Sequence, residues 1–379
     1  MITAEITHLL FQQYWWLLVS LLGALLVFLL FVQGGQTLIY TIGKTDKERK
    51  MIVNTLGRKW EFTFTTLVTF GGAFFASFPL FYATSFGGAY WAWTALLLVF
   101  ILQAVSYEFM SKPANVFGKR FYETLLFVNG LVATLIIGTV VGTFYNGADF
   151  SLNMLNNVTW HNETRGLEAL LNWHNVSLGL SIFFLARMLG ALYFILTIQN
   201  ENIYKRSKKQ ILINLIPFLI CFLSFLTYLM LKEGFAVDPE GTVFMEKYKY
   251  LHNLLDMPIV LVILLLGIIG VLWGVLKTLF SKTNFEKGFW FAASGTVLTV
   301  LALLLIAGLN NTAFYPSYAD LQSSLTIQKA SSSLFTLKIM SYVSLLIPVM
   351  LGLAIISWRA INKHKITEDE MNDENEKSY

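Results

Sequence analysis

Long apolar stretches separated by short polar connections repeat along the whole chain. A helix that crosses a bilayer needs about 20 mostly apolar residues, and most of these stretches are longer, which predicts tilted helices or protruding helix ends. The pattern therefore predicts an all-α polytopic membrane protein with nine transmembrane helices, roughly at residues 14–43, 57–84, 89–111, 122–147, 167–198, 209–233, 250–279, 286–309 and 334–361.

Lysine and arginine are distributed unevenly between the two sides of these helices. The connections after the first, third, fifth and seventh helices, together with the C-terminal tail, hold 20 of the 27 basic residues, and Arg187 lies within the fifth helix. Basic residues are enriched in cytoplasmic loops, so the N-terminus is predicted outside and the C-terminus in the cytoplasm. An even number of helices would break this alternation, so the charges support nine.

Composition agrees with a membrane protein, because 56% of the residues are hydrophobic and only 13% are charged, against about a quarter charged in soluble domains. Cys221 is the single cysteine, which excludes a disulfide framework and a cysteine-ligated metal site. The N-terminus lacks a signal-peptide pattern, so we expect the first helix to be retained. The acidic stretch 368–379 is typical of a solvated, disordered tail.

The connection after the first helix carries a helix-start signal. Gly43 can end the first helix, and Thr45 and Glu48 then have the spacing of a capping box. We therefore expect a short helix start here that leads into the second transmembrane helix.

The histidines lie in tails, in an outer loop or at helix ends: His8, His161, His174, His252 and His364. A haem held across a helical bundle needs a strong ligand that projects inward from a helix. His174 and His252 could meet at the outer face, but satisfied interfacial histidines are the favoured interpretation. We therefore expect no haem in this chain. It also shows no metal pair, no nucleophile with a neighbouring base and no glycine-rich phosphate loop.

Charged residues are few within the predicted transmembrane helices, where a charge at mid-bilayer costs about 2.5–3.5 kcal/mol on insertion scales. Arg187 lies near the middle of the fifth helix and cannot deprotonate, so it needs a buried partner, a headgroup or a ligand. Asp256 lies near the outer end of the seventh helix, just before Pro258, and a local hydrogen bond is the favoured explanation there.

Four polar residues are predicted at similar depth near the cytoplasmic side. Gln33 and Gln36 ("VQGGQTL") lie in the inner half of the first helix, Glu61 opens the second helix and Glu108 closes the third. Three antiparallel neighbours could gather these side chains into one polar file. A carboxylate there can take up protons from the cytoplasm, and partial burial eases its protonation near neutral pH.

The alternative for each carboxylate is an interfacial ion pair. Glu61 is two residues from Lys59 and three from Arg58, and Glu108 stands four residues before Lys112, the favourable spacing for a pair on a helix surface. The residues alone favour the ion pairs, and proton handling stays open.

Two long motifs resemble subunit II of cytochrome bd quinol oxidase. The first is "GKTDKERKMIVNTLGRKWE" followed by "TFGGAFFASFPLFYATSF", and the second is "SLTIQKASSSLFTLKIMSYVSLLIP" at 324–348. The resemblance extends from the first predicted helix through the ninth. Its tryptophan–acid pair corresponds to Trp60 and Glu61, and a family aspartate near the end of the third helix is matched by Glu108.

This chain departs from the family pattern at several positions. Gln33-Gly34-Gly35-Gln36 stands where Asp-Gly-Phe-Asp is typical, and Glu61 replaces an aspartate. Lys329 stands where an acidic or amide residue often precedes the small-residue cluster. Two acidic residues of the family pattern are thus glutamines in this chain, and two aspartates are replaced by the longer glutamate. A proton path copied from other members would therefore differ at these positions.

The resemblance implies a fold of two four-helix bundles plus one peripheral helix. The first bundle would occupy 1–147 and the second 148–310, followed by an outer loop and the ninth helix at 311–361 and the cytoplasmic tail at 362–379. All of this forms one integral membrane domain in the bacterial cytoplasmic membrane. No nucleic-acid partner is expected.

The resemblance also implies a function in a heterodimer with a haem-bearing subunit I. That subunit would hold two b-type haems, one d-type haem and the quinol site, and the complex would reduce dioxygen to water and generate a proton-motive force. This chain would stabilise the complex and contribute to cytoplasmic proton uptake through Glu61, Glu108, Gln33, Gln36 and Trp60. It would also hold a structural quinone or a lipid. A small single-helix third subunit stays open.

Two other functions are compatible with the residues. A secondary transporter would use Arg187 and Asp256 as substrate or coupling-ion groups, although the symmetry of an inverted repeat is not visible. A structural scaffold without proton traffic would differ in one respect, because neutralising Glu61 or Glu108 would leave turnover intact.

Overall fold

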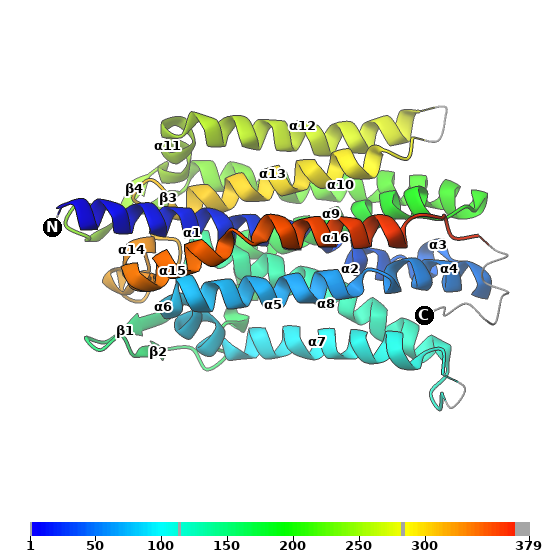
Figure 1. Ribbon diagram of the computed structural model, residues 1–379, viewed down its shortest axis with the longest axis horizontal. Coiled ribbons are helices and arrows are strands. Elements are labelled where there is room, and N and C mark those ends of the chain that lie inside the picture. Colours follow the sequence, from blue (N-terminus) through cyan, green and yellow to red (C-terminus); the bar gives the residue numbers. More distant parts are fainter. Residues whose placement is uncertain (1, 113–114, 282–284, 368–379) are drawn as a thin grey trace.

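The computed structural model of the protein describes residues 2–112, 115–281 and 285–367. Within them, long helices run side by side along the longest axis of the molecule (Figure 1). Among the described residues, seven helical spans are long and apolar enough to cross a membrane, and two bent helix pairs bring the number to nine if each pair is one span. The seven are α1–α2 (Ile2–Leu29 and Phe31–Gln36), α7 (Tyr90–Phe109), α8 (Lys119–Asn146), α9 (Trp173–Thr197), α10 (Glu201–Leu231), α12 (Pro258–Phe280) and α13 (Gly288–Gly308).

The second predicted helix was placed too far along the chain. Helix α5 (Trp60–Ser77) ends before Pro79, and the chain then turns by 118° into α6 (Pro79–Phe81) and the π-helical turn η1 (Tyr82–Gly87). Proline has no N–H to donate and its ring collides with the carbonyl one turn back, so a helix does not continue straight through it. Periodicity alone does not show such a turn.

Proline also divides the seventh and ninth predicted helices. The seventh consists of α11 (Lys249–Asp256) and α12, which starts at Pro258, and the ninth consists of α15 (Leu334–Ser344) and α16 (Ile347–Ile361), bent by 40° just before Pro348. The fifth starts later than predicted, because 167–171 form the 3₁₀ turn η2 and Asn172 then caps α9.

The predicted capping box is confirmed. Helix α3 (Ile39–Ile42) ends at Gly43, and α4 (Asp46–Gly57) begins with the Thr45 side chain accepting from the Glu48 N–H while the Glu48 carboxylate accepts from the Thr45 N–H. The polar linker after the first span therefore starts a helix, as its residues predict.

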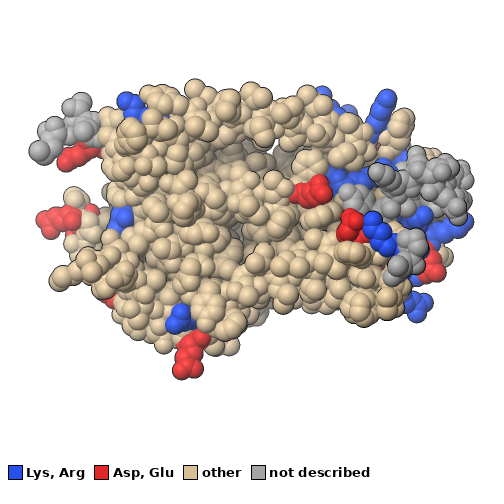
Figure 2. All heavy atoms as spheres, turned by 60° about the horizontal axis from the view of Figure 1, so that its bottom comes forward, with Lys and Arg blue, Asp and Glu red and all other residues tan. Residues whose placement is uncertain are grey.

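The two ends of the helical array differ in character. One end, on the left of Figure 1, carries the antiparallel hairpins β1–β2 (Phe150–Leu152, Val158–Trp160) and β3–β4 (Glu233–Val237, Val243–Lys247), the turn η3 (Leu321–Ser323) and α14 (Ile327–Ala330). Lysine and arginine gather mainly at the opposite end (Figure 2). That end holds the connections whose basic residues predicted the cytoplasmic side. The acidic tail predicted at 368–379 lies outside the described residues.

One continuous hydrophobic core runs through the helical array. Helix α9 packs against α10, α8 and α2, α13 packs against α12 and α1, and further contacts join α1 to α5 and α7 to α8. Helix α16 contributes no buried residue, as expected of a helix at the edge. The division into two four-helix bundles stays a prediction.

Candidate functional site: a buried amide network and an apolar cavity

Glycines bring three helices into backbone contact around α2. A Cβ atom at Gly34 would collide with the carbonyl group of Ala186 in α9, and a Cβ atom at Gly130 in α8 would collide with the carbonyl oxygen of Gln33. Small residues at helix contacts in membranes allow such close approach. The glycines thereby hold the side chains that flank Gly34 and Gly130 within hydrogen-bond reach of one another.

Five polar side chains form a network here, and all of them are almost completely buried. The Gln103 Oε1 atom accepts from Gln33 Nε2 (2.8 Å), Gln36 Nε2 (2.6 Å) and Asn129 Nδ2 (2.7 Å). Asn129 Nδ2 also lies 2.8 Å from Gln36 Oε1, and Gln36 Nε2 donates to the Tyr107 hydroxyl at 3.0 Å. The network joins α2, α7 and α8.

The network leaves some of its hydrogen-bonding capacity unused. Gln33 Oε1, Gln103 Nε2 and Asn129 Oδ1 are buried and have no partner among the described residues. Leaving such a group unsatisfied costs about 1–3 kcal/mol, so the network is suited to hold water that bridges these atoms. Amide side chains do not ionise, so the network can orient a hydrogen-bonded chain but cannot itself store a proton.

The structure separates the four residues predicted to converge. Gln33 and Gln36 meet, but Glu61 and Glu108 are exposed, so the prediction of one buried polar file is wrong for the carboxylates. Glu108 forms the alternative ion pair with Lys112 at 3.0 Å. Lys59 is buried and its Nζ atom lies 4.4 Å over the Trp358 ring. The carboxylates stay at the surface because Trp60 and Tyr107, the residues just before them, turn inward.

Trp60 connects the surface to the network. Its ring stacks on Tyr107, with ring centroids 6.0 Å apart and planes within 15°. The sequence prediction missed Gln103, Tyr107 and Asn129. A signal for the two amides existed, because each stands alone in an apolar helix, in "FILQAV" and "FVNGLV". Polar residues inside transmembrane helices are costly and face the interior.

Arg187 and Asp256 each find local partners. Arg187 Nε donates to Asn214 Oδ1 at 2.8 Å, and its Nη1 donates to the hydroxyl of Thr37 at 2.7 Å. Asp256 is exposed and accepts from Asn310 Nδ2 at 3.0 Å. The predicted local hydrogen bond of Asp256 is confirmed, and the two charges do not share a site.

His174 is held by two hydrogen bonds at the outer end of α9. Its Nε2 lies 3.1 Å from the Phe225 carbonyl oxygen and its Nδ1 lies 2.6 Å from Asn146 Nδ2. Both ring nitrogens are therefore engaged. His252 instead contacts Glu246 Oε1 at 2.8 Å, so the interpretation of two separately satisfied histidines is confirmed.

Lys232 completes this outer cluster. Its ammonium donates to the Tyr145 carbonyl at 2.6 Å and to Asn146 Oδ1 at 2.8 Å. Burial lowers the pKa of Lys232 to about 8, since desolvation disfavours the charged form.

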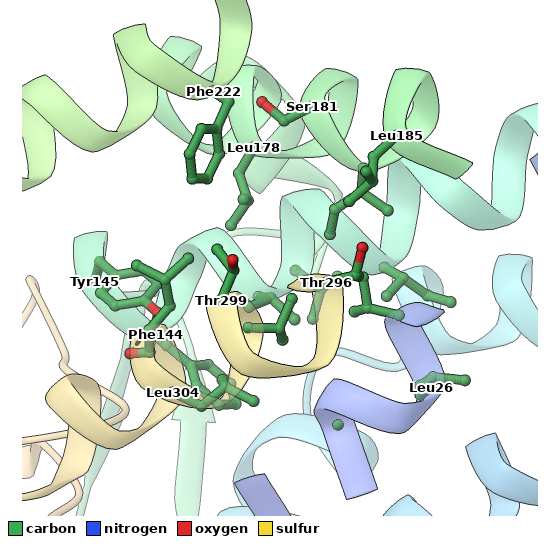
Figure 3. Close-up of a pocket in the computed structure, with 18 of the residues that line it drawn as sticks. Leu26, Phe144, Tyr145, Leu178, Ser181, Leu185, Phe222, Thr296, Thr299 and Leu304 are labelled. Atoms are coloured by element: carbon green, nitrogen blue, oxygen red, sulfur yellow. Dashed lines mark hydrogen bonds between the residues drawn. The ribbon is translucent and has the colours of Figure 1, made fainter. Parts of the chain in front are cut away.

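An apolar cavity of about 250 Å³ lies at the centre of the helical array (Figure 3). Its walls come from α1, α5, α7, α8, α9, α10, α12 and α13, with side chains such as Leu26, Phe144 and Phe222. The hydroxyls of Ser181, Thr296 and Thr299 donate to carbonyl groups of their own helices at 2.7–2.9 Å. The wall therefore offers hydrocarbon rather than hydrogen bonds, which suits an apolar chain.

The fold, the apolar cavity and the network of buried amides define a polytopic helical membrane protein. Within that class, the chain belongs to the family of cytochrome bd terminal oxidase subunit II, whose family model matches residues 11–361. The resemblance seen in the two sequence motifs is thereby confirmed.

Related proteins align over nearly their whole length. The chain is 29% identical over 359 residues to "Probable cytochrome oxidase subunit 2" of Haemophilus influenzae, covering 91% of this chain and 92% of the relative. It is 27% identical over 354 residues to cytochrome bd-I ubiquinol oxidase subunit 2 of Escherichia coli K12, covering 89% and 90%. A chain of the bd oxidase from Geobacillus thermodenitrificans has the same fold, with a TM-score of 0.62 at 15% identity, covering 95% of this chain and 100% of that chain.

Proposed function

We propose that this chain is subunit II of a bd-type terminal oxidase, a complex that oxidises membrane quinol and reduces dioxygen to water. The observation that carries the proposal is the family match over residues 11–361. It is supported by the relative in Escherichia coli, which is named as a subunit of a ubiquinol oxidase. The chain then works as one part of an oxidoreductase in the bacterial cytoplasmic membrane, with the N-terminus outside and the basic end of the helical array in the cytoplasm.

In this proposal the haem-bearing subunit I carries the redox chemistry. It holds two b-type haems and one d-type haem, and the present chain stabilises it, with or without a small third subunit. The engagement of both His174 nitrogens within this chain supports the division of labour, because a haem ligand must keep a nitrogen free for iron.

Cytoplasmic proton uptake is the second part of the proposal. Glu61 and Glu108 are exposed and directly follow Trp60 and Tyr107, whose rings stack, and the proposal places the entrance to the amide network beside these two carboxylates. Tyr107 accepts from Gln36 inside. Protons would be collected by the carboxylates and handed to water held among the amides, whose unpaired atoms provide the contacts.

The apolar cavity would hold a structural hydrophobic molecule. The hydroxyls of Ser181, Thr296 and Thr299 bond to their own helices, and the Tyr145 hydroxyl donates to the Leu303 carbonyl. This supports an acyl or isoprenoid chain as the occupant rather than a quinone ring that needs hydrogen bonds. Filling the cavity would restore the dispersion contacts that its apolar walls lack.

Native mass spectrometry of the affinity-tagged chain, purified in mild detergent from its own membranes, tests the function. The expected result is a complex with a haem-loaded partner of similar size that oxidises quinol. Recovery of the chain alone or as a homo-oligomer without haem would overturn the proposal.

A further inference from the structure

Arg187 carries a positive charge inside a membrane-spanning helix, and no acidic side chain among the described residues neutralises it. The ion pairs between described residues do not include Arg187. Its hydrogen bonds go to neutral groups of Asn214 and Thr37. The guanidinium stays protonated in proteins, and a charge within a membrane span is normally paired. The described contacts therefore satisfy several of its N–H groups but leave its charge uncompensated.

The guanidinium also has a donor left over. Nε donates to Asn214, and Nη1 donates to the carbonyl oxygen and the hydroxyl of Thr37. Nη2 donates to no residue that the structure describes, yet it keeps accessible surface, whereas the unpaired atoms of the amide network are fully enclosed. A ligand can therefore reach Nη2 without any rearrangement of the helices.

This accessible surface lies on the outward side of α9. Four residues of α9 share partial exposure and follow one another at spacings of three or four: Val176, Leu180, Phe183 and Arg187. Such a spacing places them on one side of a helix, and we call them the outward stripe. Leu178, Ser181 and Leu185 line the apolar cavity from the opposite side of α9 (Figure 3). Arg187 therefore faces the surroundings of the helical array rather than its interior.

The depth of Arg187 in the membrane follows from its contact with α10. Asn214 accepts from Arg187, and the exposed Lys209 precedes Asn214 by five residues on the same helix. At a rise of 1.5 Å per residue, Asn214 lies roughly 8 Å deeper than Lys209. Lysines near the ends of membrane helices lie at the level of the lipid headgroups. The phosphate layer is thus within reach of the long arginine side chain, aided by local thinning of the bilayer.

The surroundings of Arg187 suit a lipid better than a partner helix. Ile213 and Ile216, close to Asn214 in the sequence, are 48% and 59% exposed. The Phe183 ring centre lies 5.3 Å from Cζ of Arg187. Helices that pack on one another in membranes present small residues, whereas bulky aliphatic and aromatic side chains provide apolar surface for acyl chains. The anion that meets Arg187 should therefore carry a hydrocarbon chain.

We propose that Arg187 binds the phosphate of an anionic phospholipid in the leaflet at the basic end of the helical array. Nη2 donates to a phosphate oxygen, the phosphate neutralises the guanidinium, and one acyl chain lies along the outward stripe over Phe183. A zwitterionic lipid is a poorer partner, because its own ammonium competes for the phosphate. The site is separate from the apolar cavity and does not depend on the assignment of the chain to an oxidase.

Lipid binding to the delipidated protein, purified with the subunits that accompany it, tests this inference. Native mass spectrometry would follow the binding of added phosphatidylglycerol or phosphatidylethanolamine to the wild type, to Arg187→Gln and to the control Arg359→Gln. Arg359 is exposed on α16. We expect tight binding of one phosphatidylglycerol to the wild type and the control, and about tenfold weaker binding to Arg187→Gln, as loss of one charge-assisted hydrogen bond gives.

A second variant neutralises the charge while Arg187 stays in place. Asn214→Asp keeps the shape of the side chain and the oxygen that accepts from Nε at 2.8 Å, and its carboxylate pairs with the guanidinium from within the chain. This variant is expected to lose the preference for phosphatidylglycerol although the bond from Arg187 to Thr37 remains. Arg187→Lys keeps the charge and is expected to keep the preference.

Three results would overturn the inference. The first is equal binding of phosphatidylglycerol to Arg187→Gln, Asn214→Asp and the control. The second is binding of phosphatidylethanolamine to the wild type as tight as that of phosphatidylglycerol. The third is loss of a partner subunit from both variants at unchanged lipid binding, which would assign the anion to a carboxylate of that partner. Haem content and quinol oxidation of the same samples report separately on the proposed function, which can fail while lipid binding holds.

Discussion

The amide network depends on one acceptor, and Gln103→Leu removes it. Gln103 Oε1 accepts three N–H groups, from Gln33, Gln36 and Asn129. Leucine has a similar volume and fills the same apolar surroundings, so the substitution removes hydrogen bonds with little change in packing. The expected effect is a loss of stability of the helical array.

The size of this loss of stability depends on which hydrogen-bond partners remain for Gln33, Gln36 and Asn129 after Gln103 is replaced. Gln36 keeps its bond to Tyr107, and Asn129 keeps its contact with the Gln36 carbonyl. Among the residues that the structure describes, Gln33 Nε2 has no hydrogen bond besides the one to Gln103. Side-chain hydrogen bonds between membrane helices average about 0.6 kcal/mol each, because the unfolded chain in the membrane also finds partners. Three lost bonds therefore destabilise the protein by about 2 kcal/mol.

The free energy of unfolding can be measured by titrating mixed micelles with sodium dodecyl sulfate and following helix loss. Gln328→Leu is the matched control, because Gln328 is exposed and lies on α14, which is not one of the helices α2, α7 and α8 that form the network. If the two leucine variants differ by less than about 0.5 kcal/mol, the network contributes nothing beyond what solvent water supplies.

A second substitution separates the hydrogen bond from other effects. Gln33→Leu combined with Gln103→Leu removes both partners of the 2.8 Å bond, so no donor stays orphaned at Gln33. The double variant is expected to lose less stability than the sum of the single variants. Strict additivity would mean that the two amides do not interact.

Three further predictions concern packing, pH and turnover. Gly34→Ala is expected to prevent folding or assembly, because the added methyl group would collide with the backbone of the neighbouring helix. The control Gly72→Ala has open space around the added methyl group and should leave the yield of folded complex unchanged. The pKa of Lys232 in the folded protein, about 8, lies below the ordinary value of 10.5, so the unfolded chain binds more protons between these two pH values and the stability of the protein should rise with pH there. The midpoint of unfolding should show this rise in the wild type and lack it in Lys232→Met. Equal pH dependence of the midpoint in both proteins would contradict the assignment of the rise to Lys232. Glu61→Gln and Glu108→Gln should slow quinol oxidation at unchanged haem content, and full turnover in both would remove the carboxylates from proton uptake.

The sequence by itself determined the features that depend on local pattern. The apolar stretches are long enough to predict the helical spans, and the spacing of Thr45 and Glu48 specified a capping box that the structure contains. The two motifs indicated the family that the comparison confirms. These features follow from residues close together in the chain, where periodicity, capping and hydropathy act directly.

The tertiary structure decided which polar residues meet. Gln33 and Glu61 looked equivalent by depth, but one is buried and the other is exposed. Depth along a helix can be read from residue count, whereas the direction of a side chain around the helix depends on the neighbours that it packs against. Asn129 reaches Gln36 because Gly130 lets α8 touch α2, and Gln103 joins them from α7. Such contacts link residues many positions apart, and their geometry follows from the close packing of the whole array rather than from any local pattern.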